Sequence, residues 1–549
     1  MRISEWFRSG TPWVWLSASA VAANVFLVAS LLVVLVWQGF GHFWPHPVLD
    51  VTLPAEGGRV IGEPSQSETV PVGRLRSLGL PVPEGRDMVE RQLLKVGNRD
   101  LLGSDFRWLM ADDLQGARYP SDLAVMERRE WGNFYGFVRA VKQEGQVVAE
   151  GDAVAAAVAE RLERALAIHE EIRHTEKDEI GAINYGLERL RLRGRRLELD
   201  KDADPAKREA IEAERKALQA EYAGLQQKLV DLYGQIRRDA LLVEVSSGQQ
   251  VEVPLQKIVR VYYPNAMGLS GKLAFYFGKL GEFVADEPRE ANTEGGIFPA
   301  IFGTVLMVFI MTLLVAPFGV IAAVYLREYA HQGALTQLIR IAVNNLAGVP
   351  SIVYGVFGLG FFVYFLGGHL DRIFFPEALP APTFGTPGLI WASLTLAILT
   401  VPVVIVSTEE GLTRIPRMIR EGSLALGATK WETLWRTVLP MSSPAIMTGL
   451  ILAIARAAGE VAPLMLVGVV KLAPSLPLDG NAPFIHLERK FMHLGFHIYD
   501  VGFQSPNVEA ARPLVYATAL LLVLVILALN LVAITIRNRL RERFRAEES

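Results

Sequence analysis

The chain has 549 residues, of which 51% are hydrophobic and 21% charged, and its formal net charge is −3. This length exceeds one ordinary domain, and the mixture of apolar and charged residues indicates separate membrane and aqueous parts. The small net charge argues against nucleic-acid binding, because proteins that bind phosphate backbones concentrate Lys and Arg on one face. The chain contains no cysteine, which excludes disulfides, thiolate metal sites and cysteine nucleophiles.

Six apolar stretches are long enough to cross about 30 Å of hydrocarbon as helices. The predicted spans cover residues 14–37, 297–325, 341–366, 389–406, 448–470 and 514–536. The first span follows basic residues, as a signal peptide does, but its apolar run is longer than such a peptide needs and predicts an uncleaved anchor. We therefore expect an all-α polytopic membrane protein.

Lys and Arg in the short connecting segments predict the orientation of these spans. With both termini in the cytoplasm, most basic residues lie inside, including those of the basic tail at 537–549. The short outside loops then hold few, among them Arg372, Arg489, Lys490 and Arg512. This arrangement places residues 1–40 as a cytoplasmic segment with the first span, residues 41–295 outside, and the other five spans at 296–536.

The outside segment has its own internal plan. Residues 51–90 are rich in Gly, Pro and charge and suggest a partly extended linker, whereas residues of about 105–150 and 241–265 contain short strand patterns. From about 155 to 238, apolar residues repeat every three or four positions around a helix-breaking Pro205, which favours an antiparallel coiled-coil hairpin inserted in a β domain. Its architecture resembles efflux membrane-fusion proteins and fits partner binding or a solvated spacer.

The predicted cytoplasmic loop at 409–440 contains the sequence EGSLALGATKWETLWRTVLP, which predicts a helix, a sharp turn and a second helix. Gly427 can end the first helix, and Thr429 with Glu432 forms a T-x-x-E capping box that begins the second. Apolar residues follow at the spacing of one helical face, at Trp431, Leu434, Trp435 and Val438. Such a face in a cytoplasmic loop indicates contact with the membrane surface or with a partner's groove.

The same loop resembles the EAA loop of ABC-importer permeases, whose pattern is EAA, three residues, Gly, nine residues and I-x-L-P. The positions that match are Glu421, Gly427, Leu439 and Pro440. Gly422 and Ser423 stand where the family has two alanines, and Thr437 stands where it has Ile. In that family the loop docks on the ATP-hydrolysing subunit, so the resemblance implies coupling contacts at the matching residues and at Ala428.

Two further segments resemble signature spans of phosphate-importer permeases, namely NLAGVPSIVYGVFGLGFF at 345–362 and ARAAGEVAPLML at 455–466. The resemblance covers residues 297–536 and, loosely, the first span. It implies an ABC type-1 importer permease fold in a long-loop form, a bacterial inner membrane, and phosphate as the substrate. It also implies a complex with a homologous second permease, two ATP-binding subunits and a periplasmic phosphate-binding protein.

The first signature segment is rich in residues that allow close helix approach or a local break. We expect pore-helix packing at Gly348, Pro350, Ser351 and Gly355, followed by Gly358 and Gly360. Glycines that merely fill a packed wall would give the same pattern.

Arg456 and Glu460 lie near the middle of the predicted fifth span, where each charge is costly. Their i, i+4 spacing predicts that they share one helical face and turn together toward a watery interior. One hypothesis is a buried ion pair that only fixes helix register. The other is that Arg456 serves a passing anion in the translocation pathway while Glu460 holds the guanidinium in place.

No G-x-x-x-x-G-K-[ST] motif and no H-E-x-x-H or similar histidine spacing occurs in the chain. We therefore expect neither an enzyme nor a metal site, and no cofactor bound by this chain; ATP and Mg²⁺ are expected in a partner ATPase. Two rival functions remain. One is an ABC permease for another anion, and the other is a membrane-anchored adaptor that acts through the outside coiled coil.

Overall fold

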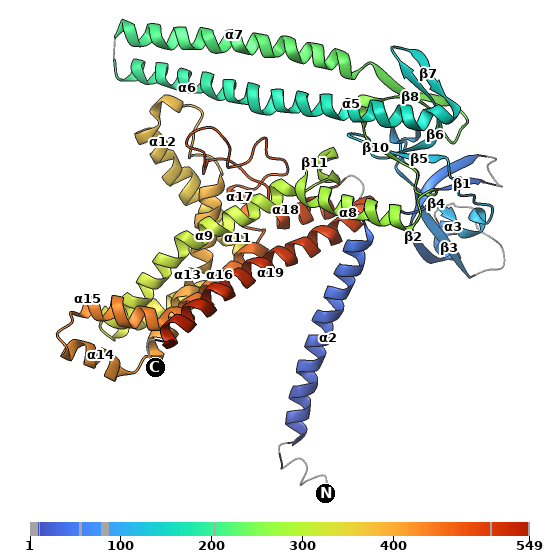
Figure 1. Cartoon of the computed structure of the whole chain (residues 1–549). Coiled ribbons are helices and arrows are strands. Elements are labelled where there is room, and N and C mark those ends of the chain that lie inside the picture. Colours follow the sequence, from blue (N-terminus) through green and yellow to red (C-terminus); the bar gives the residue numbers. More distant parts are fainter. Residues whose placement is uncertain are drawn as a thin grey trace.

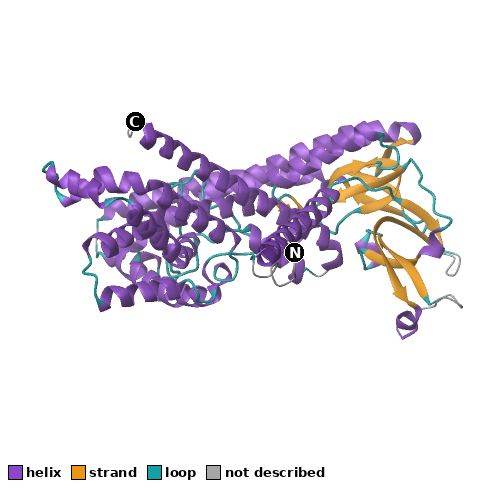
Figure 2. Cartoon of the chain, turned by 90° about the horizontal axis from the view of Figure 1, so that it is seen from below, coloured by secondary structure: helices purple, strands orange, loops and turns teal. Residues whose placement is uncertain are grey.

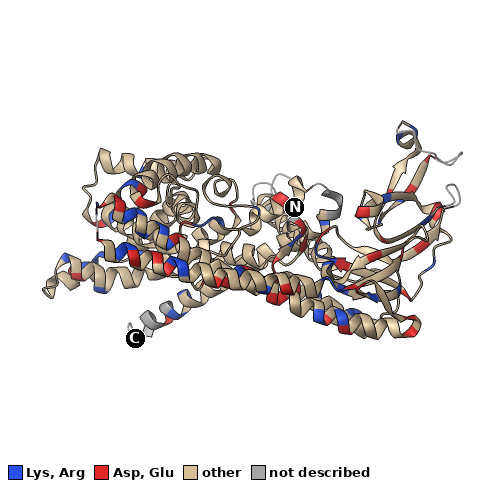
Figure 3. Ribbon diagram, turned by 90° about the horizontal axis from the view of Figure 1, so that it is seen from above, with Lys and Arg blue, Asp and Glu red and all other residues tan. Residues whose placement is uncertain are grey.

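The computed structural model describes residues 9, 11–53, 58–77, 87–201, 204–505 and 508–546. Helices form one end of the molecule and strands the other, as the colouring in Figure 2 shows. A long pair of helices, labelled α6 and α7, runs from the strands back over the helical end (Figure 1). Charged residues are frequent along this pair and the strands, whereas much of the helical end carries few of them (Figure 3).

Six helices among the described residues are long and apolar enough to cross a membrane, which confirms the predicted number. They are α2 (Thr11–Gly41), α9 (Phe298–Val324), the continuous α11, η7 and α12 (Ser351–Phe374), α13 (Leu389–Arg414), the continuous α15, η9 and α16 (Lys430–Gly459) and α19 (Val508–Ala546). The most buried is α13, with 67% of its apolar stretch inside the molecule, whereas α2 has 0%. The core of the helical part therefore forms around α13, and α2 stands apart from it (Figure 1).

The third span lies further along the chain than predicted. The prediction was 341–366, but the membrane-length helix is Ser351–Phe374, and a separate helix α10 (Ala334–Leu346) precedes it. Pro350 separates the two, because proline lacks an N–H and disfavours a helical conformation in the residue before it. Apolar composition alone did not show this break.

The fifth span is also shifted, from the predicted 448–470 to Lys430–Gly459. Glu460 has an extended backbone, with φ −81° and ψ 134°, and ends the helix, and Pro463 follows. The apolar residues beyond this point form the short helix α17 (Leu464–Val467) instead of continuing the span.

The strands form two main antiparallel sheets. The first has the order β1 (Leu49–Thr52), β2 (Arg59–Pro71), β3 (Met88–Lys95) and β4 (Phe106–Met110). The second has the order β10 (Ile258–Tyr262), β5 (Leu123–Arg128), β6 (Phe134–Gln143), β8 (Asp239–Glu244) and β9 (Gln250–Pro254), and β7 (Gln146–Glu150) also pairs with β6. We call these two sheets the strand part.

The predicted linker at 51–90 is wrong, because all of β2 and the start of β3 lie within it. The charged residues of its strands are half-buried or exposed, while Val60, Val70 and Val89 are buried. Composition suggested a linker because it averages over the two faces of a strand, whereas the alternation of side chains separates them.

Between β7 and β8 the chain forms α5 (Val154–His174), a π-turn η3 (Thr175–Glu179), α6 (Ile180–Leu199) and α7 (Pro205–Ile236). The continuous α5–α6 and the returning α7 lie side by side, and we call them the helix pair (Figure 1). Pro205 begins α7 at its first turn, where Asp204 accepts a hydrogen bond from the Ala206 N–H at 3.0 Å. A Cβ at Gly186 would lie 3.0 Å from Leu218, so the two helices approach closely there.

Candidate functional site

The turn between α14 (Arg417–Ala425) and α15 (Lys430–Thr433) is closed by its own backbone. Gly427 has φ +90°, and its N–H donates to the Leu424 carbonyl at 3.0 Å, while the Ala428 N–H donates to the Ser423 carbonyl at 3.3 Å. These are the two bonds of a Schellman motif, which requires a left-handed residue at the position of Gly427. The predicted helix stop is therefore confirmed.

The predicted capping box is confirmed as well. Thr429 Oγ1 accepts from the Glu432 N–H at 3.2 Å, and Glu432 Oε2 accepts from the Thr429 N–H at 2.9 Å. Because both ends of the turn are hydrogen-bonded internally, α14 and α15 keep a defined mutual angle without needing a partner.

The predicted apolar face of the second helix is wrong in one respect, because it divides in two. Leu434 and Val438 are buried against Leu412 and Ile415, in the chain's own core. Trp431 and Trp435 are 63% and 62% exposed, and their rings stack with centroids 5.8 Å apart. The π-turn η9 (Leu434–Val438) precedes Pro440, which cannot donate a backbone hydrogen bond, and this turn changes the register of the helix.

The exposed tryptophans belong to a larger apolar surface on this turn, which we call the coupling patch. Its members are Met418, Leu424, Leu426, Trp431 and Trp435, all of which are exposed. Leu426, at the tip of the turn, is the most exposed of them, at 92%. A cluster of large exposed apolar side chains on a rigid turn indicates a protein-binding surface.

The coupling patch is tied to the end of α9 by contacts that the sequence did not reveal. Arg420 pairs with Glu328 at 3.0 Å and also donates to the Leu412 carbonyl at 2.7 Å. Lys430 donates to the Glu328 carbonyl and lies 4.4 Å from the centre of the Tyr329 ring. A displacement of the turn would therefore act directly on the π-turn η6 (Tyr325–Tyr329) that ends α9.

The other residues of the predicted coupling set are spread along the segment. Glu421 is exposed on α14, and Leu439 and Pro440 are half-buried at the start of α16 (Leu439–Gly459). The structure thus brings Gly427 and Ala428 together in the turn and leaves Leu439 and Pro440 in the helix that follows.

Arg456 and Glu460 form an ion pair, but not on a continuous helical face. Arg456 lies in the last turn of α16, Glu460 is the residue that ends it, and their Nε and Oε1 atoms are 3.6 Å apart. Their side chains are 32% and 21% exposed. A cation at the carboxyl end of a helix is stabilised by the helix dipole, so the helix end favours Arg456 independently of Glu460.

The break after α16 is held by close packing and by backbone hydrogen bonds. A Cβ at Gly355 would lie 2.7 Å from Pro463 Cα, so α11 (Ser351–Phe357) approaches the break only because that residue is glycine. The Gly388 N–H donates to the Val467 carbonyl at 2.9 Å, which satisfies part of the irregular backbone. Irregular backbone at membrane depth is tolerated where the protein supplies such partners.

The remaining residues of the predicted packing set differ in importance. A Cβ at Gly358 would lie 2.3 Å from Thr395 Oγ1, whereas one at Gly348 would have only a contact at 3.4 Å and one at Gly360 none within 4 Å. Pro350 caps α11 and Ser351 is its first residue, without a side-chain capping bond. Close helix approach therefore explains Gly355 and Gly358, but not Gly348 or Gly360.

On the far side of the helical part from the coupling patch, the helix pair contacts two connecting loops (Figure 1). The Tyr185 hydroxyl donates to the Ala482 carbonyl, and its ring lies 6.0 Å from that of His486. Arg196 lies 3.8 Å from Glu377, in the connection after α12 (Gly368–Phe374). These contacts place the helix pair against the loops that connect the spans at this end.

The loop that receives Tyr185 has an ionic network of its own. Asp479 accepts from Arg489 at 2.6 Å, from the Asn481 N–H at 2.8 Å and pairs with His486 at 3.0 Å. Burial opposes ionisation of Asp479, but these hydrogen bonds outweigh it and lower the pKa of its carboxyl to about 2. The loop is therefore held by a carboxylate that stays ionised at neutral pH.

No group of three or more His, Cys, Asp or Glu side chains within the described ranges could hold a metal ion. The features that carry chemistry in the helical part are thus the coupling patch and the ion pair at the break in the fifth span.

Comparison with known proteins gives a family match over residues 315–546, to the family described as binding-protein-dependent transport system inner membrane component. The probable ABC transporter permease protein YqgI of Bacillus subtilis is 30% identical over 236 residues, which are 42% of this chain and 74% of that protein. The phosphate transport system permease protein PstA 1 of Mycobacterium tuberculosis is 34% identical over 247 residues, which are 44% of this chain and 71% of that protein.

The phosphate transport system permease protein PstC of Xylella fastidiosa is 30% identical over 222 residues, which are 38% of this chain and 68% of that protein. Among solved structures, the inward-facing MetNI methionine ABC transporter covers 44% of this chain and 94% of that chain at 18% identity, with a TM-score of 0.32. That score is too low to support an argument. The family match begins at residue 315, so the strand part and the helix pair lie outside it.

Proposed function

Because this chain belongs to the family of binding-protein-dependent transport system inner membrane components, we propose that it is a permease subunit of an ATP-driven importer of inorganic phosphate. It forms half of the translocation pathway in a multi-pass inner-membrane complex. Its partners are a homologous second permease, two ATP-binding subunits and a periplasmic phosphate-binding protein. The relatives named as phosphate permeases PstA and PstC support phosphate as the substrate.

The coupling patch is the observation that carries this proposal. It presents exposed apolar side chains on a turn that is rigid by itself, which suits insertion into a groove of an ATP-binding subunit. Movement of that subunit then reaches α9 through Arg420 and Glu328, whose ion pair is 3.0 Å long. Glu421, Gly427, Ala428, Leu439 and Pro440 belong to this coupling segment.

ATP hydrolysis is assigned to the partner, with its own ATP and Mg²⁺, because this chain has no Walker A motif. The chain itself is a transport subunit that needs no cofactor. Its contribution is to convert motion at the coupling patch into opening and closing of the helices around the break after Gly459.

Arg456 is the residue that we assign to the passing anion. Its guanidinium is partly exposed at a break in the fifth span, and its planar fork of donors matches phosphate geometry. Glu460 holds the guanidinium and prevents the site from retaining phosphate too tightly. Pore-helix packing by Gly355 against Pro463 keeps the break in place.

The proposed topology has both termini in the cytoplasm and residues 41–295 in the periplasm, where the helix pair forms an accessory coiled coil. The permease domain is 296–536, and a basic cytoplasmic tail follows at 537–549. Because the chain has no cysteine, single cysteines can be labelled without background. Ala213→Cys on α7 is expected to react with a membrane-impermeant maleimide in intact cells, and Asn538→Cys only after lysis.

Uptake of radiolabelled phosphate tests the function. A strain that lacks this chain is expected to lose high-affinity uptake and to regain it with the intact gene. Unchanged uptake, and unchanged growth on limiting phosphate, would overturn the proposal. If the strain instead loses uptake of another anion only, the chain is a permease for that anion. If deletion of the helix pair alone causes all the defects of the strain that lacks the chain, the adaptor function is favoured.

A further inference from the structure

A cavity of about 800 Å³ lies where the strand part meets the spans. One side is apolar and comes from the end of α2, from α8 (Leu269–Ala285) and from the start of α19, with Trp37, Phe283 and Leu514 in its wall. The other side is formed by polar loops of both sheets and by the segment that leads into α9. The cavity is therefore amphipathic, and it lies at the ends of two predicted spans.

The polar side carries more negative than positive charge. Seven carboxylates line the cavity, at Glu63, Asp105, Glu127, Glu130, Glu282, Glu290 and Glu294, against four basic side chains, at Lys95, Arg99, Lys279 and Arg289. Two of these basic residues are already engaged, since Lys279 pairs with Glu127 at 2.6 Å and Arg289 with Glu282 at 2.7 Å. Among the other charged residues of the lining, five carboxylates therefore face two basic side chains, which is an excess of three negative charges.

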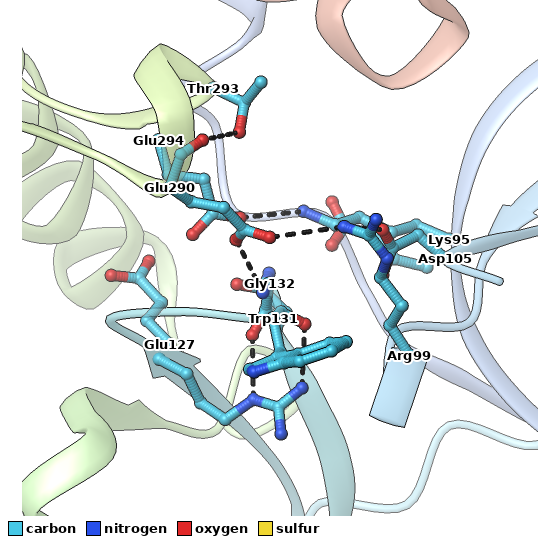
Figure 4. Close-up of polar contacts among 12 residues, drawn as sticks. Lys95, Arg99, Asp105, Glu127, Trp131, Gly132, Glu290, Thr293 and Glu294 are labelled. Atoms are coloured by element: carbon cyan, nitrogen blue, oxygen red, sulfur yellow. Dashed lines mark hydrogen bonds and ion pairs between the residues drawn. The ribbon is translucent and has the colours of Figure 1, made fainter. Parts of the chain in front are cut away.

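Three of the remaining carboxylates converge on one point beside Gly132 (Figure 4). A Cβ at Gly132 would lie 3.5 Å from Asp105 Oδ1, 3.8 Å from Glu294 Oε1 and 3.9 Å from Glu290 Oε2. Gly132 has φ +67°, and its N–H donates to Glu290 Oε2 at 2.7 Å. A residue without a side chain thus leaves open space in front of three carboxylates.

The basic residues on this side engage the three carboxylates unequally. Arg99 donates to Glu290 Oε1 at 3.4 Å, whereas Arg99 lies 3.8 Å from Asp105 and Lys95 lies 3.9 Å from Glu294, both too long for hydrogen bonds. Asp105 Oδ1 is buried without a hydrogen-bond partner. Burial raises the pKa of Asp105 and raises that of Glu294 to about 6, and it outweighs the opposing charges of the nearby basic side chains.

We propose that this cavity binds the headgroup of an ethanolamine phospholipid from the surrounding membrane. The ammonium donates to Asp105 and Glu294, and the phosphodiester faces Lys95 and Arg99. The acyl chains lie along the apolar side of the cavity and the exposed surface of α2, none of whose apolar stretch is buried within the molecule.

A lipid accounts for both sides of the cavity, whereas other ligands account for one. Inorganic phosphate would meet an excess of negative charge and an apolar wall that it cannot use. Trp37 and Trp44 in the lining are residues typical of the membrane interface, and α8, which also lines the cavity, exposes Leu273 and Phe277. The bound lipid would join the strand part to α2 and to the segment directly before α9.

Native mass spectrometry of the full-length protein, released from nanodiscs that contain equal amounts of phosphatidylethanolamine and phosphatidylglycerol, tests this proposal. Wild-type protein is expected to retain the ethanolamine lipid with a preference of about tenfold, the size of one charge-assisted hydrogen bond. The double variant Asp105→Asn, Glu294→Gln should lose this preference. The matched double variant Asp122→Asn, Glu252→Gln changes two exposed carboxylates outside the cavity and should keep it.

A second variant keeps the test independent of misfolding. Gly132→Asn tolerates a positive φ and places an amide among the three carboxylates, so it should exclude the headgroup while the sheets remain intact by circular dichroism. Equal retention of both lipids by wild-type protein, or retention unchanged in the double variant, would overturn the proposal. Displacement of the lipid by millimolar inorganic phosphate would also overturn it. The same holds if, in an assembled complex that contains no lipid, residue 44 crosslinks to a second permease.

Discussion

The helical part and the strand part are organised by different physical means. In the helical part, the notable residues lie where regular helices are interrupted, at Gly427, at Glu460 and at Pro350. In the strand part and the helix pair, sheet pairing and ion pairs are distributed over many residues, and charged residues are spread along these elements (Figure 3). The difference indicates that single substitutions should have large effects in the helical part and small ones in the helix pair.

The largest effect is expected at the break in the fifth span. Replacing Arg456 and Glu460 together with Met removes the charges while conserving volume, a change that a purely structural ion pair often tolerates. We expect the variant to assemble and to bind its ATPase, yet to import phosphate about a hundredfold more slowly, as the loss of a charge-assisted contact to the anion implies. Uptake assays in proteoliposomes would measure this.

Arg456→Gln alone should fail in the same way. Wild-type uptake by the Met double variant would show that the pair only fixes the end of the helix.

The next largest effect is expected on the coupling patch. Truncating both stacked tryptophans, with Trp431→Ala and Trp435→Ala, should weaken binding of the ATPase by about thirtyfold, since exposed aromatic anchors dominate such interfaces. Surface plasmon resonance with the purified ATPase would report the change. The control Phe503→Ala removes an exposed aromatic side chain outside the coupling patch and should leave ATPase binding unaltered. If both variants lose the same binding affinity, the assignment is contradicted.

A backbone change in the same turn should have a somewhat smaller effect. Gly427→Val forces a β-branched residue to φ +90°, at a cost of about 1–2 kcal/mol, and should lower substrate-stimulated ATP hydrolysis about tenfold at normal membrane levels. Gly333→Val is the matched control, because Gly333 has an extended backbone and nothing within 4 Å of its Cβ position. Full activity of the Gly427 variant would exclude the turn from coupling.

A pH-dependent effect is expected in the loop beneath Tyr185. The carboxyl of Asp479 has a pKa of about 2 in the folded chain against 3.8 in the unfolded reference. Its stabilisation is therefore complete above pH 3.8 and is lost as the pH falls toward 2. In Asp479→Asn at pH 7, hydrogen exchange in residues 471–490 should be about threefold faster than in the wild type. Lowering the pH should weaken the loop of that variant little further, because the carboxyl that titrates is absent.

The smallest effect is expected from shortening the helix pair. Replacing residues 188–216 with a short Gly-Ser turn keeps Tyr185 and the close approach of Gly186 to Leu218, and it removes the long Arg196–Glu377 pair to the connecting loop. An ion pair as long as 3.8 Å, whose arginine is 65% exposed, contributes little, so phosphate uptake should change less than twofold. Collapse of uptake at normal membrane levels would place the helix pair in the transport mechanism or in docking of the binding protein.

Several local features follow from the sequence, because their causes lie within a few residues. The T-x-x-E pattern at Thr429 and the glycine at position 427 specify a capping box and a left-handed turn whose hydrogen bonds span three to five residues. The number of spans follows from apolar length alone, whereas the bounds of the third and fifth spans do not. Roles for individual residues in transport remain predictions that the experiments above test.

Features that depend on distant partners were decided by the tertiary structure. The ion pair between Arg420 and Glu328 joins residues that are 92 positions apart, and no sequence pattern around Glu328 predicts it. Leu434 became a core residue and Trp431 an exposed one because α13 covers only one side of their helix. The cavity beside Gly132 forms where loops of both sheets meet the ends of two spans, and its carboxylates come from separate segments whose charges interact only once the chain has folded.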